Sequence, residues 1–323
     1  MTVTLSSRPR SPDRNHEAQG GISVEPASRA HRADQVLSAI LVSLLAAGSV
    51  AGLFVDGLYR DPASVAAMFR GYDLVTIAIV VPSLAVTLLP ALRRSARALF
   101  VRTGLLAYSV YHSAVYVFGT EFNDIFLIHV AVFSLSVITL SLTLARIDVS
   151  GVARRFPDRT PVRAIGGTLL FLAGTLAVFW SAPSLRFAFT GALPEEGSML
   201  VVPIEITHLG WALDLSLLVP AYAAAGALLW RRAAWGYVLA TVVLVAGVLQ
   251  QVDYIAALLF QATAEIPGAT GFDPIEPFIT AIYLVGALVM LKGVCGPATQ
   301  GMLADTRLID PQVQPASSLL TGR

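Results

Sequence analysis

The chain has 323 residues, of which 55% are hydrophobic and 13% are charged, whereas an ordinary soluble domain carries about a quarter charged residues. This composition favours an integral membrane protein. The formal net charge of +1 gives no reason to expect a nucleic acid as a partner, which would require a basic face, and the single cysteine, Cys295, excludes an intramolecular disulfide.

The two ends of the chain are polar. Residues 1–33 are rich in Ser, Pro, Arg and Asp and cannot bury enough apolar surface to fold alone, so they are predicted to be a disordered cytoplasmic tail. Residues 295–323 are assigned in the same way. Between them, residues 34–294 are predicted to form the transmembrane domain. A long polar segment precedes the first apolar run, which favours an uncleaved helix over a secretory signal.

Apolar runs of membrane-spanning length recur along this domain and predict an all-α bundle of about eight transmembrane helices. The runs cover residues 36–55, 74–92, 103–119, 125–145, 165–181, 208–230, 234–259 and 278–294.

The positions of the basic residues predict the orientation of the helices. All but three of the 22 Lys and Arg residues lie on one side of the predicted topology, and the exceptions are Arg60, Arg70 and Arg186. Because cytoplasmic loops are enriched in Lys and Arg, both termini are expected to be cytoplasmic. The predicted location is the inner or plasma membrane of the cell, which the chain would cross several times.

The first exterior loop contains a helix signal. Asp61 is expected to cap, and Pro62 to open, a short helix whose apolar Val65 and Met68 would lie on the membrane surface.

The third exterior segment, 185–207, is also predicted to lie in the membrane interface, because it contains several aromatic and aliphatic residues. Trp180 and Trp211 flank it as candidate members of an aromatic belt.

The spacing of two Val-Pro pairs suggests an internal repeat. The interval from Val81-Pro82 to Arg93-Arg94 recurs between Val219-Pro220 and Arg231-Arg232, and the same offset pairs His112 with Gln250 and Tyr116 with Tyr254. Such a repeat would divide the bundle into two parallel four-helix halves, in which the two prolines kink equivalent helices.

Polar residues inside the predicted spans gather in the exterior half. Ionisable groups are costly in a bilayer unless they are paired or face water, so their positions are the best indicators of function in the sequence. They predict an exterior-facing pocket between the third, fourth, sixth and seventh helices that binds a small molecule or a lipid head group. The candidate pocket residues are Tyr108, His112, Tyr116, His129, Asp214, Gln250, Asp253 and Tyr254.

Three chemistries could use such a pocket. Histidine and carboxylate ligands suit zinc, but no HExxH or HxxxH pair places two ligands on one helix. A haem between His112 and His129 would need two ligands at one depth, and their expected depths differ. Neither cofactor is therefore predicted. His112 or Asp214 could also act as a general base in a membrane-embedded enzyme.

The structural alternative is hydrogen bonding and packing. A single histidine in a helix bundle most often bonds to a neighbouring helix, and Tyr108 with Tyr116 would then form an aromatic stripe.

Three short motifs carry a resemblance. GLYRD at 57–61, RGYDLVT at 70–76, and the tyrosine-rich helix that runs into Phe118-Gly119 resemble an uncharacterised family of bacterial polytopic membrane proteins. The resemblance implies a multi-helix membrane fold and no particular activity. Family members have Asn-Tyr where this chain has His112-Ser113, which favours a hydrogen-bonding role for His112 that asparagine could also fill.

The function expected from the sequence is that of a ligand-binding or accessory membrane protein. Its expected partners are membrane lipids and a small-molecule ligand, while the sequence identifies no protein partner. A transporter is an alternative that the repeat and the kinked helices favour, although the interior half has few polar residues. A further alternative is an enzyme that uses Asp214 and His112.

Overall fold

The computed structural model describes residues 26–92, 95–193 and 199–294. This part of the chain is helical throughout, without a strand. Residues 1–25 and 295–323, which hold most of the N-terminal tail and all of the C-terminal tail predicted above, lie outside the described residues. The first helix begins at Pro26, so the stretch 26–33 of the expected tail is helical.

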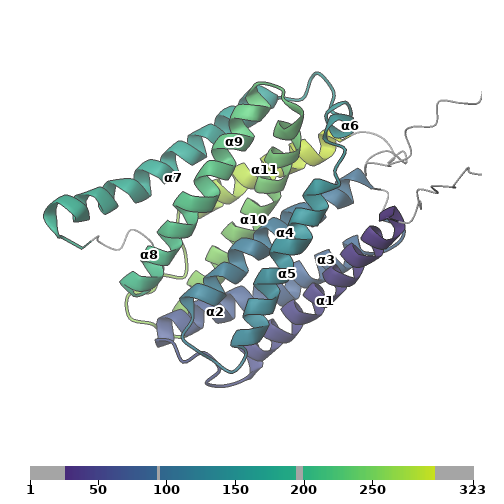
Figure 1. Cartoon of the computed structure of the whole chain (residues 1–323). Helices are drawn as coiled ribbons and strands as arrows, with labels where there is room; N and C mark the ends of the chain where they lie inside the picture. Colours follow the sequence, from purple (N-terminus) through teal and green to yellow (C-terminus); the bar gives the residue numbers. More distant parts are fainter. Residues whose placement is uncertain (1–25, 93–94, 194–198, 295–323) are drawn as a thin grey trace, which may run out of the picture.

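Eleven α-helices and two π-helical segments follow one another in the described residues (Figure 1). They are α1 (Pro26–Phe54), α2 (Ala63–Val75), η1 (Thr76–Val80), α3 (Val81–Thr87), α4 (Ala96–Gly119), α5 (Phe126–Ala145), α6 (Val149–Ala153), α7 (Val162–Thr190), α8 (Ile204–Leu213), η2 (Asp214–Leu218), α9 (Val219–Trp230), α10 (Ala234–Thr263) and α11 (Glu276–Gly293).

Seven helical stretches in the described residues are long and apolar enough to cross a membrane. Two of them are composite, because α2, η1 and α3 run on as one helix and α8, η2 and α9 as another. Helix α4 has 24 residues and is also long enough to cross a membrane. It contains Arg97, Arg102 and His112, however, so it is less apolar than the seven stretches counted above. The fold is therefore that of a multi-pass helical membrane protein.

The surface helix expected after Pro62 is instead the beginning of the second span. Val65 and Met68 are 0% and 2% exposed, so they pack inside the bundle and the prediction that they lie on the membrane surface is wrong. Asp61 does not cap this helix; its Oδ1 accepts a hydrogen bond from the backbone N–H of Glu121 at 2.9 Å. Partial burial of Asp61 raises the pKa of its carboxyl group.

The segment predicted to lie in the interface after residue 185 is partly helical as well. Helix α7 continues to Thr190 and ends at Gly191, which adopts the left-handed conformation common at helix C-termini. Trp180 and Trp211, the candidate belt residues, stack on each other with their ring centroids 5.1 Å apart. The Trp180 indole also bonds to a buried acceptor that is described below.

The two composite spans contain the same backbone irregularity at equivalent positions. In each, a five-residue π-helical segment comes directly before the Val-Pro pair, and the valine N–H bonds to the carbonyl five residues earlier: Val81 to Thr76, and Val219 to Asp214. Proline lacks an N–H and its ring collides with the carbonyl four residues before it, which a wider turn accommodates. The interval between these segments also separates the first residues of α4 and α10. These features agree with the predicted repeat.

Helices α4 and α10 lie side by side in the middle of the bundle (Figure 1). Helix α10 also packs on α2, and α4 packs on α8, so the offset of the predicted repeat relates these two contacts. Close approach of α2 and α10 depends on Gly71, because a Cβ there would lie 2.8 Å from the carbonyl oxygen of Ala256.

This contact predicts opposite effects for two glycine substitutions. Gly71→Ala should destabilise the protein by about 1–3 kcal/mol, because α2 and α10 must separate to admit the methyl group. Gly174→Ala on α7, where a Cβ meets nothing within 4 Å, should be neutral or stabilising by up to about 1 kcal/mol through helix propensity. Thermal unfolding in detergent measures both, and equal effects of the two variants would contradict this packing.

Candidate functional site

The largest of the described cavities lies between α2, α4, α8, α10 and α11 and has a volume of about 380 Å³. Its size is within the range usual for small-molecule sites. Five of the eight predicted pocket residues line it: His112, Asp214, Gln250, Asp253 and Tyr254. Tyr108 lies directly behind this wall, and Tyr116 and His129 line a smaller neighbouring cavity of about 30 Å³ that also reaches His112.

Asp253 on α10 is held by two residues of α4. Its Oδ2 accepts a hydrogen bond from the Tyr108 hydroxyl at 2.7 Å and lies 3.0 Å from Nδ1 of His112. The Nε2 atom of His112 lies 3.0 Å from the Thr76 hydroxyl, at the start of the first π segment. With a proton on Nδ1, the imidazole donates to Asp253 and accepts from Thr76, so a neutral ring satisfies both contacts.

The geometry leaves one oxygen of Asp253 available. Its Oδ1 is buried and has no hydrogen-bond partner among the described residues, although Asp253 lines the large cavity. Both ring nitrogens of His112 are already engaged by protein groups. The unsatisfied polar atom at this part of the wall is therefore the carboxylate oxygen and not the imidazole.

Asp214 occupies the first position of the second π segment and has a separate set of partners. Its Oδ1 accepts from the Tyr111 hydroxyl at 2.7 Å, and its Oδ2 accepts from Nε1 of Trp180 at 2.9 Å. This bond explains why Trp180 turns inward and stacks on Trp211. The sequence indicated Asp214, but Trp180 comes from α7, and no spacing in the sequence relates the two.

A third buried carboxylate, that of Asp73 on α2, lies inside the bundle at 2% exposure. Tyr59 donates to its Oδ2 at 2.6 Å and Tyr116 to its Oδ1 at 3.1 Å. Burial, with the nearby Asp73 charge, raises the pKa of Tyr59 far above its usual range, so Tyr59 remains a neutral donor. His129 packs against the ring of Tyr116, with centroids 4.9 Å apart.

The large cavity is acidic and aromatic. Four carboxylates line it, and none of the described residues around it is Lys or Arg. Seven aromatic side chains complete the wall. The carboxylates belong to Asp214, Asp253, Asp273 and Glu276, and the rings to Tyr72, Tyr111, Trp180, Trp211, Tyr222, Tyr254 and Tyr283.

The cavity ends within the bundle. Tyr283 donates a hydrogen bond to the Tyr222 hydroxyl at 3.1 Å, which joins α11 to α9 at the cavity wall. Both tyrosines belong to the main apolar core, together with residues such as Phe156 and Met290 towards the end of the bundle that carries most arginines. The described residues contain no group of three or more His, Cys, Asp and Glu side chains placed to hold a metal ion.

Comparison of the chain with models of protein families, with curated proteins and with solved structures gives no match. The resemblance described from the short motifs stays a prediction, and the function must be argued from the geometry.

The Asp73 cluster predicts a specific cost of replacing its carboxyl group by an amide. Asp73→Asn replaces one acceptor oxygen by an NH₂ group, so one of the two tyrosine hydroxyls loses its bond to this side chain and the free energy of unfolding should fall by about 1–3 kcal/mol. Asp124→Asn is the matched control, because it removes an exposed ion pair with Arg60 and should change stability by less than about 0.5 kcal/mol. Chemical or thermal unfolding in detergent compares them, and an Asp73→Asn variant as stable as the control would show that the tyrosine bonds are unimportant.

Proposed function

We propose that this membrane protein binds, in the large cavity, a small molecule or lipid head group that carries a positively charged nitrogen. The observation that carries the proposal is a wall of four carboxylates with no Lys or Arg among the described residues that line it, in which Oδ1 of Asp253 has no partner within the described part of the chain. A buried anion without a counterion is costly, and a bound cation would offset that cost.

The aromatic lining supports the same class of ligand. Tyrosine and tryptophan rings attract amines and quaternary ammonium groups through their negative faces, most strongly where water is excluded. Trp180 and Trp211 present stacked indoles beside Asp214. Tyr72 on α2 and Tyr111 on α4 line the same cavity. An anionic ligand would meet repulsion from the carboxylates, and an apolar one would leave Oδ1 of Asp253 without a hydrogen-bond partner.

The distribution of charge supports an exterior opening. The cavity wall includes Leu200, Val202 and Asp273, which belong to loops at the end of the bundle where few arginines lie. By the positive-inside rule that end faces away from the cytoplasm. We include α4 as an eighth span in this arrangement, because it lies between membrane-spanning helices and supplies Tyr108, Tyr111 and His112 to the site.

Binding of choline, compared with its uncharged isostere 3,3-dimethylbutanol, tests the proposal. Choline should raise the unfolding temperature of the detergent-purified protein and show saturable binding by calorimetry, whereas the isostere should do neither. A long-chain trimethylammonium lipid analogue extends the test to head groups. Equal effects of the charged and uncharged compounds would exclude a site for cations.

The Asp253→Asn variant links this binding to the site. The asparagine oxygen can still accept from Tyr108 and His112, so the fold should persist, but the loss of the charge should weaken binding of the cation about 10- to 100-fold. Asp124→Asn should bind as the wild type does. Unchanged affinity in Asp253→Asn would place the site elsewhere.

A transporter is the second candidate, because matched π segments and prolines in two halves are typical of helices that bend during alternating access. Proteoliposomes loaded with buffer should then accumulate radiolabelled choline, and Asp253→Asn should abolish the uptake. Saturable binding of choline without uptake would exclude the transporter and favour a ligand-binding protein. The enzyme alternative with Asp214 and His112 has less support, since both side chains are engaged by protein groups.

A further inference from the structure

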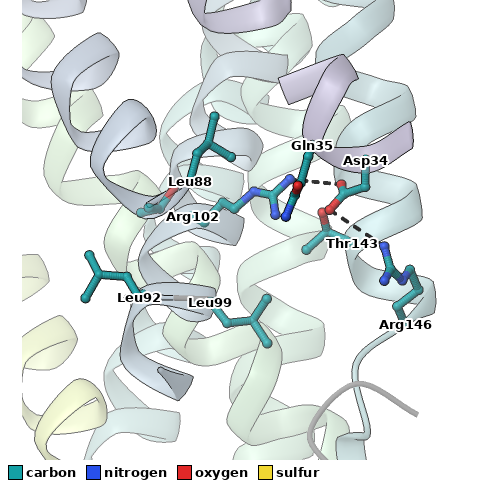
Figure 2. Close-up of a pocket in the computed structure, with 10 residues that line it drawn as sticks. Asp34, Gln35, Leu88, Leu92, Leu99, Arg102, Thr143 and Arg146 are labelled. Carbon is teal, nitrogen blue, oxygen red and sulfur yellow. Dashed lines mark hydrogen bonds and ion pairs between the residues drawn. The ribbon is translucent and has the colours of Figure 1, made fainter. Parts of the chain in front are cut away.

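A second polar cluster lies at the other end of the bundle, where α1, α4 and the end of α5 meet. Asp34 stands between two arginines: its Oδ1 lies 2.9 Å from Nη2 of Arg102, and its Oδ2 lies 3.7 Å from Nη1 of Arg146 (Figure 2). Arg102 also donates to the Ser38 hydroxyl, and Ser38 in turn donates to the Asp34 carbonyl. These contacts join three helices that are distant in sequence.

The cluster brings basic side chains to one cavity. Two guanidinium groups lie beside one carboxylate, and Asp34 is the only acidic side chain among the described residues that line the adjoining cavity. The side chains of Asp34 and Arg102 are 5% and 11% exposed, so the charge is not freely hydrated. A buried donor that lacks an acceptor is unfavourable in such a place, and a bound anion would supply the acceptor.

The cavity beside this cluster, of about 40 Å³, has donors on one side and leucines on the other. Nε of Arg102 and Oγ1 of Thr143 are buried and have no hydrogen-bond partner among the described residues, and both residues line the cavity. Figure 2 shows the polar groups of Arg102, Thr143 and Asp34 close together, with Leu88, Leu92 and Leu99 on the opposite side.

We propose that this cavity binds a phosphate group, either the head group of an anionic phospholipid or free phosphate. Phosphate offers several acceptor oxygens, which suits donors that approach from Arg102 and Thr143 together, and arginine is the side chain best shaped for it. The leucine wall suits the glycerol and first acyl carbons of a lipid. Basic pockets between helices on the cytoplasmic side are typical sites for anionic lipids. The site is separate from the acidic cavity, and its test does not depend on the binding of cations there.

The test uses full-length protein in a maltoside detergent, which carries no phosphate. Three probes are added in turn: phosphatidylglycerol, inorganic phosphate, and a glucosyl diacylglycerol that has the acyl chains without the phosphate. Native mass spectrometry counts bound lipid, and thermal unfolding reports binding of either probe. Stabilisation by phosphatidylglycerol alone identifies a lipid site, and stabilisation by inorganic phosphate as well identifies a site for the free anion; both support the proposal. Equal retention of the glucolipid and phosphatidylglycerol, without an effect of phosphate, would overturn it.

Two variants assign the binding to this cavity. Arg146→Gln removes one positive charge but leaves the shorter pair of Asp34 with Arg102, and it should weaken phosphatidylglycerol binding about tenfold or more. Arg163→Gln makes the same change in charge at an exposed position at the start of α7 and should bind as the wild type does. Equal binding by the two variants would mean that any basic surface suffices and would overturn the proposal.

Thr143→Val keeps the test valid if Arg146→Gln unfolds. The substitution removes a hydroxyl that has no partner among the described residues, so the protein without added lipid should unfold at the temperature of the wild type or above it. Binding of phosphatidylglycerol should nevertheless weaken several-fold. Unchanged lipid binding in this folded variant would show that the cavity is not the site.

Discussion

The constraint on which this structure depends is that carboxylates inside a membrane bundle need hydrogen-bond donors. Asp73, Asp214 and Asp253 lie on three different spans, and each receives donors from a helix other than its own or from the preceding loop. Tyrosine and tryptophan supply most of these donors, because they add an apolar ring to the core while satisfying an oxygen. The bundle is therefore held by apolar packing and by these polar contacts together.

The two composite spans share a backbone irregularity and differ in the side chains they carry there. Their π segments begin at Thr76 and at Asp214, and the same offset relates His112 to Gln250. Thr76 contacts the imidazole of His112 on α4, whereas Asp214 accepts a hydrogen bond from Tyr111 on α4. Because corresponding positions carry different groups, the cavity is one-sided and acidic, and the opposite side of α4 is filled by the Asp73 cluster.

Charge is divided between the two ends of the bundle. The acidic cavity and the basic cluster around Asp34 are separated by apolar core, in which Leu106 and Leu244 are almost fully buried. Such a division suits the two proposed sites, one for a phosphate group and one for a cation. The net charge near zero therefore does not reveal either site, because acidic groups gather at one end of the bundle and basic groups at the other.

The sequence alone determined that the chain is a multi-pass helical protein, because apolar runs of spanning length require no tertiary information. It also indicated the helices and several residues of the candidate site, since ionisable groups stand out in apolar runs. The partners of those groups were decided only by the tertiary structure: Trp180 for Asp214, Tyr59 for Asp73, and Asp34 for Arg102. Val65 and Met68 were misplaced for the same reason, as a hydrophobic pattern does not distinguish a face turned to lipid from one turned to α10. Lipid and the protein interior are both apolar, so the hydrophobic pattern shows only that a side chain is kept from water. Packing between the helices determines whether that side chain contacts lipid or another helix.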